Sequence, residues 1–164
     1  MEDKSFKSYE KKERVLAKQY FEYSNITEYT FEPDGNYATT DGDYVIDGKK
    51  VRFEIKVRNF EKDRFPTLIL ELKKAAQLLQ YHKQGYKATY LNFFKEADGT
   101  HTAIEFDLST RFKYWQHKGY KNLRDVSITK SLPSYTAGSG GYFIDKEVIM
   151  LTPQPKVDII TTFS

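Results

Sequence analysis

Residues 51–58 read VRFEIKVR, and this stretch decides the fold that we expect for the chain. Apolar and charged residues alternate strictly over its eight positions. Because successive side chains of a β-strand point to opposite faces, the alternation is typical of a half-buried strand. Glu54 and Lys56 then share one face, about 6–7 Å apart at about 3.3 Å per residue. The pattern therefore sets an acid beside a base, on a face that meets either water or a substrate.

The residues before this strand predict its partners. Residues 43–47, DYVID, read as a short strand, and the Asp-Gly pair at 47–48 is typical of a hairpin turn. Residues 26–32 are rich in strand formers and predict one more strand. Residues 10–23 contain no Gly or Pro and carry apolar residues at spacings of three and four, which predicts an amphipathic helix.

The residues after the strand predict a helix and a second hairpin. Pro66 suits the first turn of a helix that runs through residues 67–84 and stops at Gly85. Residues 86–94 and 101–108 read as two strands joined by a turn. In the remainder, TAGSGG at 136–141 reads as a flexible loop and residues 142–151 as one or two strands.

The predicted order is helix, three strands, helix and two strands, which favours an α/β or α+β class with the second helix as a crossover. A chain of 164 residues is long enough to bury its own core. We expect one domain over 1–164, with its core at about 10–108 and a basic, aromatic extension at 109–164.

The composition excludes several classes of site. The chain has no cysteine, so disulfides, thiolate zinc sites and cysteine nucleophiles are absent. Its three histidines are scattered without the spacing of metal ligands. No apolar run approaches the roughly 18 residues of a membrane span, and the polar start does not resemble a signal peptide. We expect a cytoplasmic or otherwise intracellular protein with no membrane partner.

The charges are unevenly distributed along the chain. Residues 19–48 contain no Lys or Arg but seven acids, whereas residues 49–95 contain twelve bases and four acids. This asymmetry is either the chance pattern of a surface or a cation site that faces a polyanion site.

The predicted hairpin brings two acids and a lysine close together. Asp43 starts its first strand, and a tight turn would return Glu54 close to Asp43. Two carboxylates that converge would bind a divalent cation such as Mg²⁺ or Mn²⁺, which prefers oxygen ligands. A lysine on the same face, Lys56, can orient or deprotonate a water that attacks phosphorus.

Asp43, separated by ten residues from Glu54-Ile55-Lys56, resembles the signature of the PD-(D/E)xK nucleases. The resemblance covers roughly residues 10–108 and extends to the order of elements, since the core of that family is αβββαβ. It implies a restriction-endonuclease-like fold with a mixed central sheet flanked by helices. It also implies a Mg²⁺-dependent endonuclease that hydrolyses DNA.

The resemblance assigns roles to the residues of the signature. Asp43 and Glu54 would hold the metal, and the backbone carbonyl of Ile55 would add a ligand. Lys56 would be the catalytic lysine, which positions the nucleophilic water and offsets charge on the scissile phosphate.

Two further positions match subgroups of the family. Archaeal Holliday-junction resolvases place an additional acid on the first helix, where Glu13 lies on the apolar stripe and Glu10 is the second choice. The nuclease domains of bacterial recombination helicase-nucleases carry a Gln-x-x-x-Tyr pair on the next helix, which Gln77 and Tyr81 match in spacing.

Alternatives remain for the first metal ligand. The literal Pro-Asp dipeptide is Pro33-Asp34, twenty residues before Glu54. A Pro-Asp-Gly turn is a poor platform for a rigid ligand. We therefore favour Asp43, and keep Asp41 and Asp34 as alternatives.

Nucleic-acid contacts are expected from basic residues near the active strand and from residues 111–124, which hold five Lys or Arg, four aromatics and no acid. The residues chosen are Lys49, Lys50, Arg52, Arg58, Arg111 and Lys113. A homodimer is a further expectation from the resemblance. The alternatives are a nuclease acting on RNA, a non-catalytic nucleic-acid-binding module, and an interaction protein in which residues 51–58 are an ordinary edge strand.

Overall fold

The computed structural model describes residues 4–33, 40–133 and 143–164, with side chains from residue 11 onwards. Its helices are α1 (Lys4–Tyr23), α2 (Leu72–Lys83) and α3 (Leu108–His117), with short 3₁₀ turns at Lys62–Arg64 and Leu123–Val126. Its strands are β1 (Glu28–Phe31), β2 (Gly42–Ile46), β3 (Lys49–Arg58), β4 (Leu68–Glu71), β5 (Lys87–Lys95), β6 (His101–Asp107), β7 (Ile128–Pro133), β8 (Phe143–Leu151) and β9 (Ile159–Phe163).

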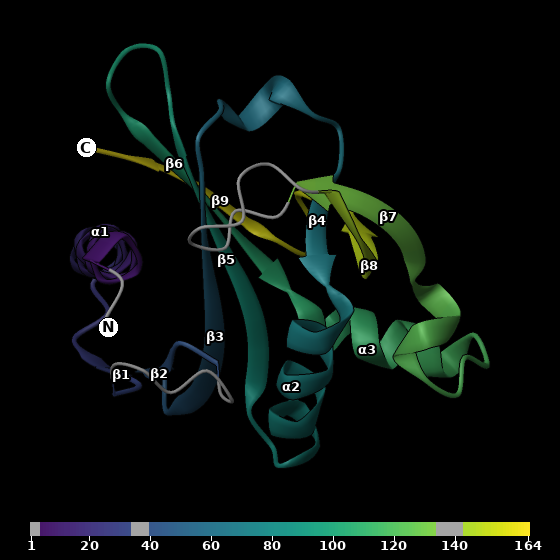
Figure 1. Cartoon of the computed structure of the whole chain (residues 1–164). Coiled ribbons are helices and arrows are strands. Elements are labelled where there is room, and N and C mark those ends of the chain that lie inside the picture. The colour runs from purple at the N-terminus through teal and green to yellow at the C-terminus, as the bar shows by residue number, and fades with distance from the viewer. Residues whose placement is uncertain (1–3, 34–39, 134–142) are drawn as a thin grey trace.

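The described strands form two sheets in a mixed α/β fold (Figure 1). The central sheet has six strands in the order β1-β2-β3-β5-β6-β9. It is mixed because β3 and β5 run parallel, whereas every other neighbouring pair is antiparallel. The smaller sheet has the order β4-β8-β7. The mixed sheet predicted from the sequence is therefore confirmed.

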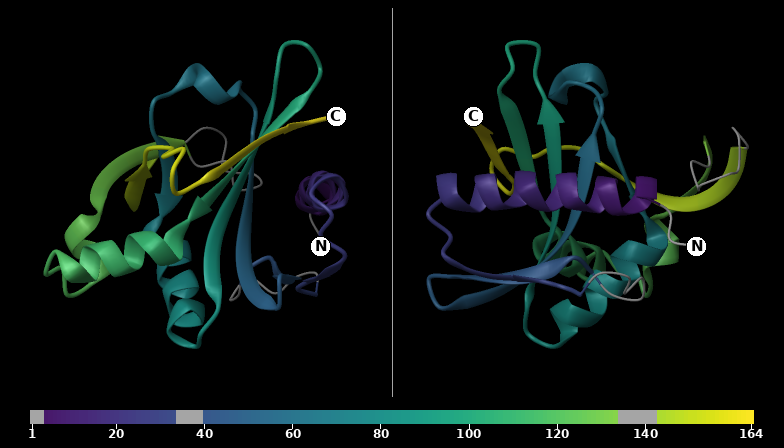
Figure 2. Two further views of the ribbon diagram at one scale, coloured as in Figure 1. Left: turned by 180° about the vertical axis from the view of Figure 1, so that it is seen from behind. Right: turned by 60° about the vertical axis from the view of Figure 1, so that its left-hand side comes forward.

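Helices cover both faces of the central sheet. Helix α1 lies across one face, and α2 and α3 lie on the other with the smaller sheet (Figure 2). The core under α1 is largely aromatic, whereas the core under α2 and α3 is more aliphatic. The largest fully buried side chains include Tyr20, Phe21, Phe53, Phe93, Phe94 and Phe106.

The side chains of β3 alternate between the two faces of the central sheet, as the sequence predicts. Val51, Phe53 and Ile55 belong to the core under α1. Residues 52, 54, 56 and 58 therefore face the side of the sheet that α2 and β4 cover. The charged face of β3 meets protein over much of its length, since Arg52 and Glu54 are both buried.

A buried polar network fastens α1 to the sheet. Glu105 on β6 is buried and accepts hydrogen bonds from the hydroxyl groups of Tyr20 on α1 and Tyr44 on β2. Burial raises the pKa of Glu105 to about 7, although the bond from Tyr20 lowers it. The network holds helix and hairpin at fixed positions over the same strand.

One predicted element is wrong. Residues 68–71 form strand β4 and not the first turn of the helix, which begins only at Leu72. Leu68 and Leu70 are buried while Ile69 and Glu71 are less so, and β4 pairs antiparallel with β8. This short alternating run was hidden in a longer apolar segment, because such segments fit both periods.

The other elements agree with the predicted ones within a few residues, except that α1 begins well before residue 10 and that β7, β9 and α3 were not assigned. The loop predicted at 136–141 and most of the turn predicted at 33–36 lie outside the described residues. Among the described helices, none is long and apolar enough to cross a membrane.

Candidate functional site

Strand β3 has two halves with different surroundings. Its first half, residues 49–53, pairs with β2 on one side, and β5 lies along its other side from Val51 onwards. Its second half, residues 54–58, pairs with β5, but β2 does not extend beside it. In the part of the chain that the structure describes, the second half therefore has an open edge. The candidate site lies at the start of this edge.

Asp41 stands at the corner where β2 leaves β3. Its backbone N–H donates to the carbonyl of Phe53 at 3.0 Å, and its carboxylate accepts the N–H of Ile55 at 2.6 Å. The register pairs Gly42 with Phe53, so Asp41 comes opposite Glu54. Glycine is required next to it, because a Cβ at Gly42 would collide with the carbonyl oxygen of Thr30. The tight corner thus positions the Asp41 carboxylate beside that of Glu54.

Glu54 is buried, with only one of its oxygens neutralised. Lys74 on α2 places its ammonium 3.1 Å from Oε1. Oε2 is buried and has no hydrogen-bond partner among the described groups. Burial, and then the charge of Asp41, raise the pKa of Glu54 to about 8. Burial also raises the pKa of Asp41. When both carboxylates are ionised, their two negative charges face a single lysine, so the pair carries an excess of negative charge.

The backbone of Ile55 adds an oxygen to the same corner. In a strand, the N–H and C=O of one residue point to the same edge. Because the Ile55 N–H points to Asp41, its carbonyl also points to the open edge, where β2 does not continue. Two carboxylates and one carbonyl are suitable ligands for a hard cation such as Mg²⁺.

Lys56 follows on the same face of β3. Its side chain is exposed at the open edge. Partial desolvation and then the charge of Arg58 lower its pKa, while Glu13 and Glu71 act in the opposite direction. The lysine is therefore held close to acids but is easier to deprotonate than a lysine in water.

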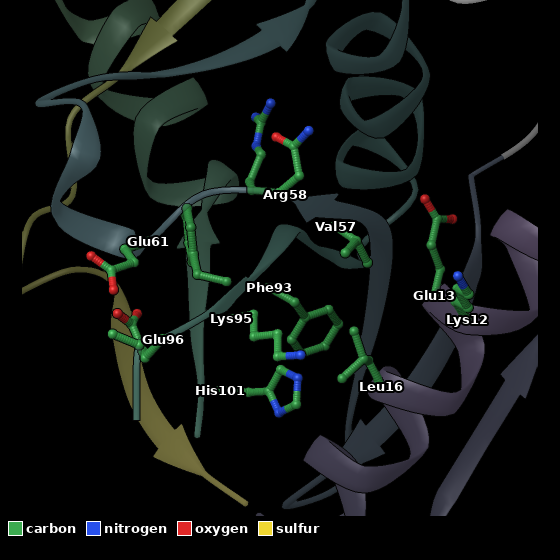
Figure 3. Close-up of a pocket in the computed structure, with 13 residues that line it drawn as sticks. Lys12, Glu13, Leu16, Val57, Arg58, Glu61, Phe93, Lys95, Glu96 and His101 are labelled. Carbon is green, nitrogen blue, oxygen red and sulfur yellow. The ribbon is translucent and has the colours of Figure 1, made fainter. Parts of the chain in front are cut away.

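Glu13 approaches from the other face of the sheet. It is half-buried on α1, and its charge contributes to raising the pKa of Glu54. Figure 3 shows it projecting from α1 next to Lys12 and across from Val57. Because this edge of β3 is open, the charge of Glu13 on one face of the sheet affects Glu54 and Lys56 on the other face. The side chain of Glu10 lies outside the described part.

Asp43, the favoured first ligand, has other partners. Its carboxylate accepts the hydroxyl of Thr30 at 2.6 Å and lies 3.2 Å from the guanidinium of Arg52. The register pairs Asp43 with Arg52, two positions away from Glu54. The predicted meeting of Asp43 with Glu54 is therefore corrected: Asp41, one of the two alternatives, lies there. Asp34, the other alternative, lies outside the described residues.

Gln77 and Tyr81 lie on α2 over β3, as predicted, and the ring of Tyr81 contacts Arg52 and Tyr86. The guanidinium of Arg52 lies 4.4 Å from the centre of the Tyr81 ring. Gln77 is half-buried between Lys74 and Tyr81 on this helix. Lys74 of α2 contacts Glu54, and this residue was not among those predicted from the sequence. The only signal for it was its spacing of three and seven residues from Gln77 and Tyr81, which places all of them on one helix face.

The predicted nucleic-acid contacts divide into two groups. Arg52 and Arg111 are buried, and Arg111 forms a double ion pair with Asp158 at 2.6 and 2.7 Å. Arg58 is half-buried and donates to Asn92 and to the carbonyl of Ile69. Arg52 and Arg111 stabilise the fold and are not available as surface contacts, whereas Arg58 also lines a cavity at the end of β3. Exposed side chains remain at Lys49, Lys50 and Lys113.

Comparison with known proteins does not extend this assignment. No family model matches the chain, and a search of curated proteins finds no match. Within the described ranges, no group of three or more Asp, Glu, His or Cys is close enough to hold a metal on side chains alone. The candidate site therefore rests on two carboxylates, a backbone carbonyl and two lysines.

Proposed function

We propose that this protein is a Mg²⁺- or Mn²⁺-dependent nuclease that hydrolyses the phosphodiester bonds of DNA, as an endonuclease. The observation that carries the proposal is the Asp41–Glu54 pair at the open edge of β3, with Glu54 Oε2 buried and unbonded. With Glu54 buried and Asp41 partly buried, an ionised pair without metal is costly, and a divalent cation would offset that cost.

The arrangement of elements supports a restriction-endonuclease-like core. With β4 set aside, the order α1, β1, β2, β3, α2, β5 agrees with the αβββαβ pattern of that family. The candidate residues also follow the pattern acid, acid-x-Lys, once Asp41 takes the place of Asp43. The homodimer stays a prediction.

The chain's own groups would divide the chemistry between them. Asp41, Glu54 and the carbonyl of Ile55 would hold the cation, and Glu13 would assist from α1. When bound, the cation polarises a phosphoryl oxygen and lowers the pKa of a coordinated water. The ammonium of Lys56 would orient the attacking water and stabilise charge on the scissile phosphate. Lys74 would neutralise Glu54 until the cation binds.

The rival function is a non-catalytic nucleic-acid-binding module. The ion pair between Lys74 and Glu54 favours it, because that pair already compensates one carboxylate without metal. Such a module would bind nucleic acid with strong salt dependence, and the bound nucleic acid would not be cleaved when Mg²⁺ is added.

Calorimetric titration with Mg²⁺ and Mn²⁺, on the wild type and on Glu54→Gln, separates these functions. We expect the wild type to bind and the variant to lose binding. Duplex, single-stranded and junction DNA, and RNA of the same sequence, are then incubated with the metal. We expect cleavage of DNA by the wild type, and its loss in Lys56→Ala with the fold retained. If the wild type neither binds metal in the presence of DNA nor cuts any substrate, the nuclease proposal fails.

A further inference from the structure

We propose that the cavity between α1 and the ends of β3 and β5 binds an unpaired nucleotide of the strand that is cut, so that single-stranded DNA is the preferred substrate. This inference rests on the proposed nuclease function and deepens it. The cavity has a volume of about 500 Å³, within the range of small-molecule sites, which is about 300–1,000 Å³.

The cavity and the candidate site meet at the open edge of β3. Val57, in the cavity wall, directly follows Lys56 but points to the opposite face of the sheet, and Glu13 lines the cavity while its charge acts on Glu54. Because β2 does not continue beside residues 54–58, a nucleic-acid strand whose phosphate lies beside Lys56 can pass around this edge and offer an adjacent base to the cavity.

The lining matches the chemistry of a nucleotide from end to end. Leu16, Val57 and Phe93 form apolar walls. The imidazole of His101 stacks on Phe163, with ring centres 5.6 Å apart, which holds it as a planar surface for a base. Exposed lysines at the rim, Lys12 and Lys95, suit the phosphate.

Acids lie at the other end of the cavity. Figure 3 shows Glu61 and Glu96 together, away from Lys12 and Glu13. Carboxylates accept hydrogen bonds from the exocyclic amino groups of bases and repel a second phosphate. The apolar walls are thus flanked by Lys12 and Glu13 at one end and by Glu61 and Glu96 at the other, with Lys95 between them, and this mixture of charges favours a single nucleotide over a polyanionic stretch.

A duplex does not offer such a base. Its bases are stacked and paired, and only a base that leaves the stack can enter a cavity between helix and sheet. A base of an unpaired strand can enter the cavity without breaking a base pair, so the cavity favours single-stranded over duplex DNA.

The test is fluorescence anisotropy of the full chain, in EDTA, with a labelled single-stranded oligonucleotide and with its duplex. We expect about ten-fold tighter binding of the single strand, in line with the effect of stacking one base. Lys95→Glu, at the rim, and Leu16→Gln, in the wall, should reduce this ratio toward one. The matched control is Lys83→Glu, an exposed lysine in the last turn of α2 that does not line the cavity, which should leave the ratio unchanged.

Each outcome bears on the inference. Equal binding of the two forms by the wild type, or an unchanged ratio in both cavity variants with their thermal unfolding intact, overturns it. Competition by millimolar deoxycytidine monophosphate, with no preference between the oligonucleotides, also overturns it and assigns the cavity to free nucleotides. If the ratio behaves as expected but no oligonucleotide is cut with Mg²⁺, the cavity assignment holds and the nuclease proposal fails.

Discussion

The two halves of β3 carry similar charges but treat them differently. In the closed half, Arg52 is buried between Glu32, Asp43 and Thr40, with a bond of 2.5 Å to the threonine, and the Tyr81 ring covers it. In the open half, Asp41 and Glu54 lie side by side and share one lysine, Lys74. In both halves one cation serves two carboxylates. In the closed half both carboxylates contact Arg52, whereas in the open half Oε2 of the buried Glu54 has no hydrogen-bond partner among the described groups, which leaves an oxygen for a cation to bind.

The sharpest way to break this comparison is to remove one carboxylate from each half. Asp41→Asn should lower metal-dependent cleavage at least 100-fold, since loss of an outer-shell partner alone costs roughly 10–100-fold in metal affinity or activity. Asp43→Asn, two residues away, should keep metal affinity, because Asp43 contacts Arg52 and Thr30. Calorimetry and a cleavage assay measure both.

The outcome of this pair of variants is decisive for the first ligand. If Asp43→Asn abolishes binding and Asp41→Asn does not, the first ligand is Asp43 and not Asp41.

A third variant removes the cation of the closed half. Arg52→Met should destabilise the protein by about 2–3 kcal/mol, less than the roughly 3–5 kcal/mol for a fully buried pair, because Glu32 and Asp43 are partly exposed. Urea unfolding monitored by circular dichroism measures the change. Lys50→Met, an exposed neighbour, is the control. A loss below about 0.5 kcal/mol would show that Arg52 is not a structural cation.

The pH dependence sharpens the comparison with a smaller effect. Because the pKa of Glu54 is raised to about 8, a cation must displace a proton below that pH. Mg²⁺ affinity should therefore rise about ten-fold per pH unit up to about pH 8 and then level off. Titrations at several pH values measure this. An affinity that is constant between pH 6 and 8 would contradict a protonated Glu54.

The same shift predicts a decline of stability with rising pH. A carboxyl whose pKa is raised in the folded state contributes its full stability below its ordinary pKa of 4.5 and loses it as the pH rises through about 8. The metal-free protein should therefore become less stable between about pH 5 and pH 8. Thermal unfolding across this range should show the decline, and added Mg²⁺ should oppose it. Glu54→Gln should flatten the profile, and an unchanged slope would contradict this assignment.

Much of the fold follows from local sequence. Asp47 and Gly48 both have positive φ, at 51° and 74°, as a two-residue hairpin turn requires. The hairpin of β2 and β3 was predicted for this reason. Strand β4 was missed because four residues of an apolar run carry too few periods to separate strand from helix.

The candidate site was predicted less well, although part of the missing information was in the sequence. A two-residue turn at 47–48 pairs Ile46 with Lys49, and counting from there sets Asp41 opposite Glu54 and Asp43 opposite Arg52. The register thus identifies the acid. The role of Lys74 depends on how α2 packs over β3. The burial of Arg111 depends on its ion pair with Asp158, which lies 47 residues away in the sequence. Tertiary packing decides these, and no local pattern reveals it.

The network of Tyr20, Tyr44 and Glu105 has a consequence for the evolution of this chain. Replacing Glu105 by an apolar residue leaves two buried hydroxyl groups without an acceptor, and replacing a tyrosine leaves a buried carboxyl short of a donor. Single exchanges are therefore disfavoured, whereas a joint exchange to apolar residues is tolerated. We expect the three positions to change together among homologues, as one inherited unit that joins the first helix, the hairpin and the sixth strand.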